Sequence, residues 1–315
     1  MKKIFNFQWL SVLMLAFLLV GCGTAEENAN EDTSKQGAQS EESGYKVKDD
    51  RGVEVAFDAV PETVVSLQPS NTEILFALGV GDKIVGATEY DTYPPEALEI
   101  ERVSDSMVFN SERILALNPD VVIAYTIGEK DALKVLEDAG VKVFVIQSAT
   151  SFEDVYGDIE QLATVMGVKD KGEQLNKEIK AKIADVQAKL ADVTTQKNAY
   201  YEVSPLPSIY TTAGGTFQQE ILDAAKVNNI FGDQQGWIQV SEEDIIAKNP
   251  EVILTTNNYI EDAVGEILGR NGWNTIPAVQ NKEVFLLDAD TLSRPGPRIG
   301  EAVELVAKAV YPELF

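Results

Sequence analysis

The chain has 315 residues, and because single hydrophobic cores stop growing near about 250–300 residues, this length predicts two domains. It carries 26 Lys and Arg against 51 Asp and Glu, a formal net charge of −25, and it contains no His. The acidic charge excludes nucleic acid as a partner, since phosphate binding needs a basic surface. The absence of His excludes His-ligated zinc and His-based general-base or triad catalysis.

The first 22 residues have the composition of an export signal. Lys2 and Lys3 precede an apolar run at 10–20 that is too short for a membrane-spanning helix. The run ends at Gly21 and Cys22, the single cysteine of the chain, which resembles the lipobox where an acylated Cys becomes the mature N-terminus. An ordinary secretory signal is the alternative. We therefore expect a lipoprotein signal peptide at 1–22, lipidation (palmitate) at Cys22, and an exported protein anchored to the outer face of the cytoplasmic membrane.

Residues 23–44 lack any large aliphatic side chain and are rich in Glu, Asn, Ser and Gly. Such a segment cannot bury enough apolar surface to order itself, so we expect a flexible tether. Since no second thiol exists, the exported part forms no internal disulfide.

Strand and helix signals alternate over residues 45–165, which predicts an N-terminal lobe with a mostly parallel sheet. The lobe begins with a hairpin at 45–57 that turns around Asp50, Arg51 and Gly52. Further elements are expected as buried strands at 63–67, 84–87 and 142–147, and as helices from Pro69 to Leu78 and over 129–139.

One stretch of this lobe recurs in the second half of the chain. Residues 110–126 read NSERILALNPDVVIAYT, and residues 241–257 read SEEDIIAKNPEVILTTN. In each copy a capping residue opens a short helix with a Glu in its first turn, and Asn-Pro ends the helix. A non-alternating apolar run then predicts a strand buried on both faces. The paired glutamates, Glu112 and Glu243, lie 131 positions apart, which predicts two similar lobes that each present an acidic side chain.

Between the two copies, residues 152–196 have no strand signal. After Gly167, apolar residues recur at spacings of three and four for about 25 residues. A continuous helix of that length spans roughly 35–40 Å, so we expect residues 166–196 to form a connecting helix between the lobes. A coiled-coil arm is the alternative, but the apolar positions keep no strict heptad.

Residues 197–315 are predicted as a C-terminal lobe of the same kind. Strands are expected at 199–203, 208–212 and 283–287, helices at 216–225 and 298–310, and a polar, Pro-containing loop at 290–297.

The sequence contains no enzyme motif: it has no P-loop, no G-x-S-x-G and no metal-spaced Cys or His. Aromatic residues instead gather where loops are expected to follow strands, at Tyr90, Tyr93, Tyr125, Tyr210 and Trp237. In open α/β folds this edge faces the binding crevice, so these side chains favour a ligand site between two lobes. Asp290 and Arg294 share one predicted loop and could contact a ligand or only each other.

Taken together, these motifs resemble the substrate-binding lipoproteins of ABC importers for vitamin B12, ferric siderophores and haem. The resemblance covers about residues 45–315, and its motifs are VVSLQPSNTE at 64–73, TEYDTYPP at 88–95, the two Glu segments, NNIF at 228–231 and RPGPRI at 294–299. It implies an α/β fold of two Rossmann-like lobes joined by one long backbone helix, the class III periplasmic-binding-protein type, with little hinge motion. It also implies that Glu112 and Glu243 dock on the two permease subunits.

Within that family the sequence is most similar to the cobalamin-binding proteins. This resemblance implies that Tyr90, Tyr125, Tyr210 and Trp237 line the cleft around the corrin ring. It also implies that Asp290 and Arg294 lie near the corrin amides and orient the ligand. The chain departs from the family pattern at Ser106, where a Trp is usual. We therefore expect a non-catalytic protein without a resident cofactor or metal site, which delivers cobalamin to an ABC importer. A ferric siderophore or haem is the alternative ligand, and a cell-surface enzyme or an adhesion protein is a remote alternative.

Overall fold

The computed structural model describes residues 44–105, 108–125 and 130–315. Its contacts divide the chain into the units Met1–Glu41 and Glu42–Phe315, and the fold described below is that of the second unit. The predicted signal peptide, Cys22 and nearly all of the tether lie outside the described residues, as do Ser106 and Met107.

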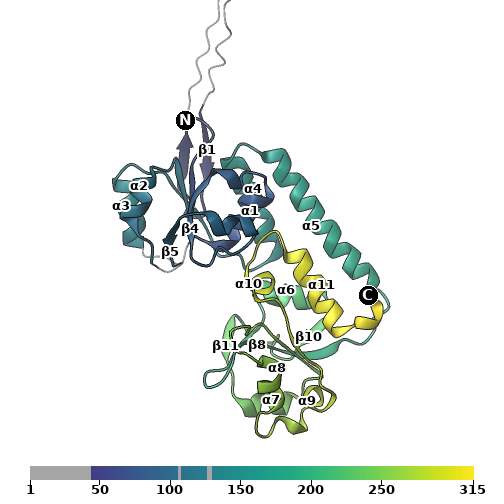
Figure 1. Ribbon diagram of the computed structural model, residues 1–315. Coiled ribbons are helices and arrows are strands. Elements are labelled where there is room, and N and C mark those ends of the chain that lie inside the picture. The colour runs from purple at the N-terminus through teal and green to yellow at the C-terminus, as the bar shows by residue number, and fades with distance from the viewer. Residues whose placement is uncertain (1–43, 106–107, 126–129) are drawn as a thin grey trace, which may run out of the picture. The chain divides into compact units, whose positions relative to one another are not determined.

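The described chain opens with the predicted hairpin (Figure 1). Strands β1 (Tyr45–Lys48) and β2 (Glu54–Phe57) pair antiparallel, with Tyr45 opposite Phe57. Asp49 fixes the turn, since its carboxylate accepts hydrogen bonds from the backbone amides of Arg51 and Val53.

A five-stranded parallel sheet follows, with the order β5-β4-β3-β6-β7. Its strands are β3 (Val64–Ser66), β4 (Ile84–Thr88), β5 (Arg102–Ser104), β6 (Val121–Tyr125) and β7 (Val143–Ile146). The connecting helices are α1 (Pro69–Ala77), η1 (Gly81–Lys83), η2 (Pro95–Glu99), α2 (Ser111–Leu117), α3 (Lys130–Asp138) and α4 (Phe152–Val165). We call β1 through α4 the N-terminal lobe.

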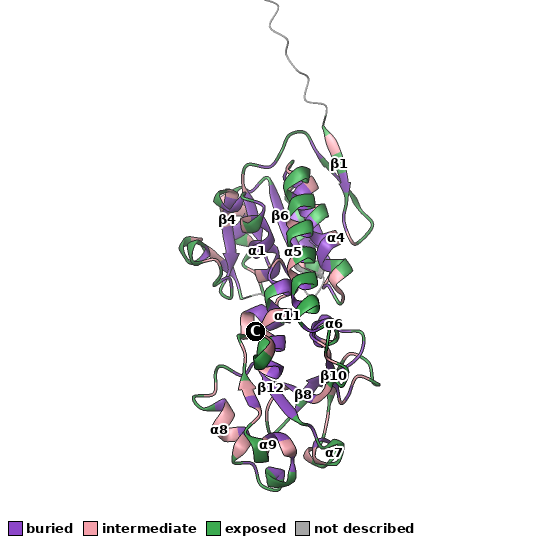
Figure 2. Cartoon of the chain, turned by 90° about the vertical axis from the view of Figure 1, so that its right-hand side faces the viewer, coloured by how far each residue is buried: buried purple, intermediate pink, exposed green. Residues whose placement is uncertain are grey.

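Both faces of this sheet are covered, which explains why its strands are continuously apolar. Val64, Ile123 and Phe144 point to the face that packs against α1 and α4. Their neighbours Val65 and Val122 point to the opposite face, where α2 and α3 supply Ile114, Leu133 and Leu136. Figure 2 shows these strands as buried ribbons inside the lobe.

The two copies of the repeated stretch fold alike, as predicted. Asn110 caps α2 by accepting a hydrogen bond from the Arg113 amide at 3.0 Å, and Ser241 caps α7 (Glu242–Lys248) with a capping box to Asp244. Both helices end at the Asn of Asn-Pro in the left-handed region, with φ of 47° at Asn118 and 52° at Asn249. Asn adopts this conformation more readily than most residues.

The predicted long helix is present as α5 (Lys169–Lys189), which has 21 residues rather than about 25. It begins after Gly167, whose φ of 67° ends the preceding helix, and its last turn closes at Leu190. Helix α5 packs against both α4 and the C-terminal helix α11 (Ile299–Val310) (Figure 1).

The second sheet has the order β11-β9-β8-β12-β13, and β10 also pairs with the long strand β8. Strands β10, β8, β12 and β13 run parallel, while β9 and β11 form an antiparallel edge. The strands are β8 (Lys197–Ser204), β9 (Tyr210–Thr212), β10 (Val227–Asn229), β11 (Trp237–Gln239), β12 (Val252–Thr255) and β13 (Val284–Leu286). Helices α6 (Phe217–Ala224), α7, α8 (Ala263–Leu268), η3 (Trp273–Thr275), α9 (Pro277–Asn281), α10 (Ala289–Ser293), α11 and η4 (Pro312–Leu314) complete this C-terminal lobe.

One hydrophobic core joins the two lobes. A single cluster of buried residues extends from the first sheet to one face of the second sheet. It also includes residues of α4, α5, α6 and α11, among them Ile183 of α5. The other face of the second sheet has a core of its own around Tyr200, Ile253 and Trp273. The predicted fold class, two α/β lobes with mostly parallel sheets and one long helix between them, is confirmed.

Candidate functional site

The parallel order of the first sheet brings the ends of its strands to one edge. Tyr90 lies two residues beyond β4 and is 59% exposed, and Tyr125 is the last residue of β6 and is half-buried. Only β3 separates these two strands, so they lie about 9.5 Å apart. Two aromatic side chains therefore stand at the edge where ligands bind in open α/β folds.

Asp290 and Arg294 come to the same edge from the C-terminal lobe. The predicted loop at 290–297 is wrong in its first part, because Asp288 accepts a hydrogen bond from the Thr291 amide at 2.7 Å and so begins helix α10. The Arg294 guanidinium lies 2.8 Å from the Asp290 carboxylate and donates to the Tyr90 carbonyl at 2.8 Å. The Thr92 hydroxyl donates to Asp290 at 2.9 Å. Tyr90, Asp290 and Arg294 thus form one group, with the Asp290 side chain 41% exposed and that of Arg294 only 12% exposed.

Glu73 of α1 is hydrogen-bonded to this group, and no pattern in the sequence predicted a role for it. Its carboxylate accepts hydrogen bonds from Arg294 at 3.0 Å and from Arg298 at 2.6 and 2.8 Å, although Glu73 is only 2% exposed. Burial opposes the charge of Arg298, but its hydrogen bonds to Glu73 and the carboxylate's charge outweigh burial and raise the pKa of Arg298. The ring of Tyr93 covers the Arg298 guanidinium at 4.1 Å. A buried ion cluster therefore ties α1 of one lobe to the segment after β13 of the other.

Tyr210 and Trp237 form a second aromatic group. Both were predicted in loops after strands, but Tyr210 opens β9 and Trp237 opens β11. Because these strands pair antiparallel with Trp237 opposite Thr212, Tyr210 and Trp237 lie on the same sheet face as diagonal neighbours, which places them roughly 7–8 Å apart. Their exposed fractions are 39% and 45%. Tyr210 also lies opposite Ser204, so it sits at the carboxyl end of the parallel strand β8.

Tyr259 is a further exposed aromatic side chain that the sequence analysis missed. It follows β12, as Tyr125 ends β6, and it is 71% exposed. In the sequence, Tyr259 lies two residues beyond the second copy of the repeated stretch, and the position equivalent to Tyr125 is Thr256. Burial raises the pKa of Tyr259, and the negative charge of Glu202 adds to this effect.

The two predicted docking residues are both exposed in the first turns of their helices. Glu112 lies on α2 and Glu243 on α7. A carboxylate in this position is favoured by the helix dipole, so the fold presents each side chain to solvent at no local cost.

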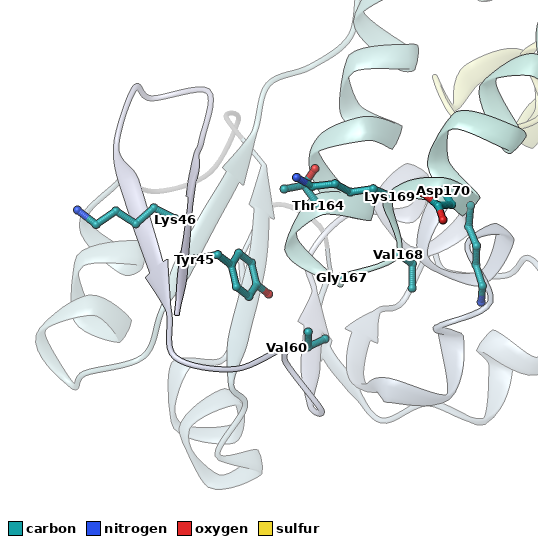
Figure 3. Close-up of a pocket in the computed structure, with 9 residues that line it drawn as sticks. Tyr45, Lys46, Val60, Thr164, Gly167, Val168, Lys169 and Asp170 are labelled. Carbon is teal, nitrogen blue, oxygen red and sulfur yellow. The ribbon is translucent and has the colours of Figure 1, made fainter. Parts of the chain in front are cut away.

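Several surface pockets occur among the described residues, and four of them are lined by none of Tyr90, Tyr125, Tyr210, Trp237 and Tyr259. One of about 540 Å³ lies beside Tyr45, Val60 and Val168, where β1 meets the turn between α4 and α5 (Figure 3). Another of about 270 Å³ is lined by Asp158 of α4. Burial, and then the charges of Asp50 and Asp154, raise the pKa of Asp158 to about 8.

No metal site and no membrane span were found in the part of the chain that the structure describes. None of its Asp and Glu side chains gather in a group of three or more that could hold a metal ion. Within the same residues, no helix combines the length and apolarity needed to cross a bilayer.

The chain is similar to known proteins in both sequence and structure. The family model for periplasmic binding proteins matches residues 64–291. Over 312 residues the chain is 39% identical to the uncharacterized ABC transporter substrate-binding lipoprotein YvrC of Bacillus subtilis (strain 168), covering 98% of this chain and 97% of YvrC.

Two solved structures are similar over most of their length. The periplasmic vitamin B12 binding protein BtuF of Vibrio cholerae superposes with a TM-score of 0.68 at 33% identity, covering 80% of this chain and 97% of BtuF. The periplasmic heme-binding protein RhuT from Roseiflexus sp. RS-1, in its apo form, gives a TM-score of 0.74 at 27% identity, covering 81% of this chain and 99% of RhuT.

Proposed function

The chain belongs to the periplasmic binding protein family, and on that premise we propose that it captures cobalamin, or another corrinoid, between its two lobes and delivers it to an ABC importer. Its role is substrate binding, and no catalytic step is assigned to it. BtuF of Vibrio cholerae, which binds vitamin B12, is 33% identical and shares the fold.

The arrangement of aromatic side chains carries the ligand proposal. Tyr90 and Tyr125 stand at the strand ends of the first sheet, and Tyr210 and Trp237 share one exposed face of the second. Flat aromatic walls suit a corrin ring, because each such side chain buries about 150–250 Å² when covered. Asp290 adds an exposed carboxylate near Tyr90, and we expect it to accept hydrogen bonds from the side-chain amides of the corrin.

Arg294 has a second role in this proposal. Because three of its contacts are to Glu73, Asp290 and the Tyr90 carbonyl, it holds the Asp290 side chain and the Tyr90 loop in position. Its 12% exposed guanidinium offers a ligand only a small remaining surface.

Delivery to the permease is assigned to Glu112 and Glu243. Both are exposed, and they occupy equivalent turns of the two repeated stretches. An importer with two permease subunits presents two equivalent surfaces, which two matched carboxylates fit. Lipidation at Cys22 and a place on the outer face of the cytoplasmic membrane complete the proposal, and the lipoprotein name of YvrC supports them.

Haem is the second candidate ligand. The similarity to the heme-binding protein RhuT, with a TM-score of 0.74, favours it, and so does the exposed Tyr259, since a Tyr oxygen can ligate haem iron. A ferric siderophore is the third candidate, but Arg294 and Arg298, the basic side chains beside Tyr90 and Tyr93, are already paired with Glu73.

A calorimetric titration panel tests the proposal. The purified protein is titrated with cyanocobalamin, haem and a ferrichrome-type ferric complex under one buffer condition. We expect cyanocobalamin to saturate at about one molecule per chain with a Kd of micromolar or below. Binding of haem or ferrichrome, together with no heat from cyanocobalamin at micromolar concentration, would reverse the ligand assignment and leave the transport role in place.

A further inference from the structure

A chain of buried polar contacts crosses the C-terminal lobe from its ligand-proximal edge. Asn257, in the loop after β12 that leads to Tyr259, donates to Glu202 of β8 at 3.3 Å. The Arg270 guanidinium donates two hydrogen bonds to the same carboxylate, at 2.6 and 2.9 Å. Glu202, Asn257 and Arg270 are 1%, 2% and 7% exposed. Bidentate pairs of this kind fix direction as well as distance.

The chain of contacts continues to the outer surface. The Arg270 guanidinium lies 4.5 Å from the ring of Trp273, which is fully buried. The indole Nε1–H of Trp273 donates to the Glu242 carboxylate at 2.8 Å. Glu242 is the first residue of α7 and precedes Glu243 directly. We call the series Asn257, Glu202, Arg270, Trp273 and Glu242 the strut.

The equivalent turn of the other lobe has no such support among the described contacts. The residue before Glu112 is Ser111, and the neighbouring Arg113 pairs with Glu101 on the surface, where their side chains are 52% and 44% exposed. Exposed pairs of this kind contribute little to rigidity or stability. The two matched carboxylates are thus held by different means.

We propose that Trp273 and Glu242 are positioning residues that hold the first turn of α7 in the orientation in which Glu243 engages the permease. The inference rests on the proposed docking role of Glu243 and goes beyond it, since Trp273 lies outside the repeated stretch and Glu242 replaces the Ser111 of the other copy. Through Arg270 and Glu202 the strut also joins this turn to the edge that carries Tyr259. The first turn of α7 and the sheet edge that carries Tyr259 are therefore held in one relative orientation.

Transport measurements in the producing organism test the functional part. The chromosomal gene is replaced by Glu242→Ala, Trp273→Phe or Glu242→Gln, and initial uptake of radiolabelled cyanocobalamin is compared with its Kd measured by calorimetry. Loss of a hydrogen bond to a charged group predicts about a tenfold lower uptake for the first two variants, with Kd changed less than about twofold. Glu242→Gln keeps an acceptor for the indole and restores most of that uptake. The exposed Glu261→Gln loses the same charge and serves as the unaffected control.

A double-mutant cycle separates positioning from a general loss of stability. On a Glu243→Gln background, Glu242→Ala and Trp273→Phe should cause no further loss of uptake, because they act through Glu243. Losses that multiply on this background, or single variants that transport like wild type, overturn the inference. Uptake that is absent in wild type refutes the proposed ligand instead.

Amide hydrogen exchange tests the structural part whatever the ligand is. The amides of Asp244 and Ile245, whose acceptors lie on Ser241, should exchange about tenfold faster in Glu242→Ala and Trp273→Phe. Glu242→Gln should leave them close to wild type. Unchanged exchange in both disruptive variants overturns the inference.

Discussion

Asp158 offers a direct test of how burial sets the pH dependence of stability. This carboxyl is 7% exposed on α4 and lines a small pocket. Asp50 from the hairpin and Asp154 from the same helix add negative charge, and with burial, the larger cause, they raise its pKa to about 8. The folded chain therefore holds a proton there that the unfolded chain releases near pH 4.

The sign and size of the effect follow from linkage. Because the folded state binds more protons between pH 4 and pH 8, stability falls as pH rises through this interval. Each pH unit costs about 1.4 kcal/mol, which gives an upper bound of roughly 6 kcal/mol across the interval. Asp158→Asn resembles the protonated acid and escapes this cost. Relative to wild type it should be equally stable near pH 4 and increasingly more stable toward pH 8.

Urea denaturation of wild type and Asp158→Asn at pH values from 4.5 to 9 measures this difference. Asp185→Asn, which removes an exposed carboxyl from α5, is the matched control and should give a difference that does not grow with pH. If the stability difference between Asp158→Asn and wild type is flat across the range, the carboxyl is not held protonated in the folded state and the reasoning is refuted.

Three further predictions concern the lobes and their ligand. Glu73→Gln should lower the free energy of unfolding by about 3–5 kcal/mol, since it leaves two buried guanidinium groups poorly compensated; an unchanged urea midpoint would contradict the ion cluster. Tyr210→Ala and Trp237→Ala should each weaken cyanocobalamin binding about tenfold in calorimetry, and full affinity in both would remove the second sheet from the ligand site. The double change of Glu112→Lys and Glu243→Lys should abolish uptake while Kd stays within about twofold, and surviving uptake would show that docking occurs elsewhere.

Local signals explain what could be predicted from the sequence. The helices α2 and α7, their caps and their Asn-Pro ends follow from a few neighbouring residues, and the strands β6 and β12 follow from uninterrupted apolar runs. The parallel order of both sheets follows from the alternation of these elements. Tyr90 and Tyr125 were placed correctly at the edge of the first sheet because parallel strands end together.

Contacts between distant residues explain what could not be predicted. Glu73 meets Arg294 and Arg298 across more than 200 residues of chain, and nothing local distinguishes it from any other Glu on a helix. Glu202 lies in the buried part of β8, where its ion pair with Arg270 and its hydrogen bond from Asn257 make burial possible. The short helix α10 was not predicted, because most of its five residues fall in the polar stretch that was expected to form a loop at 290–297.

The core that joins the lobes has a consequence for dissecting this protein. Helices α5 and α11 contribute to one apolar cluster with both sheets. Cleavage of the chain on either side of α5 would therefore expose apolar surface on both fragments. Neither piece is expected to survive alone in water, and chimaeras with relatives should exchange these helices together with the sheets they cover. Heating should accordingly melt the whole molecule in a single step, with no half-folded stage at which one sheet outlives the other.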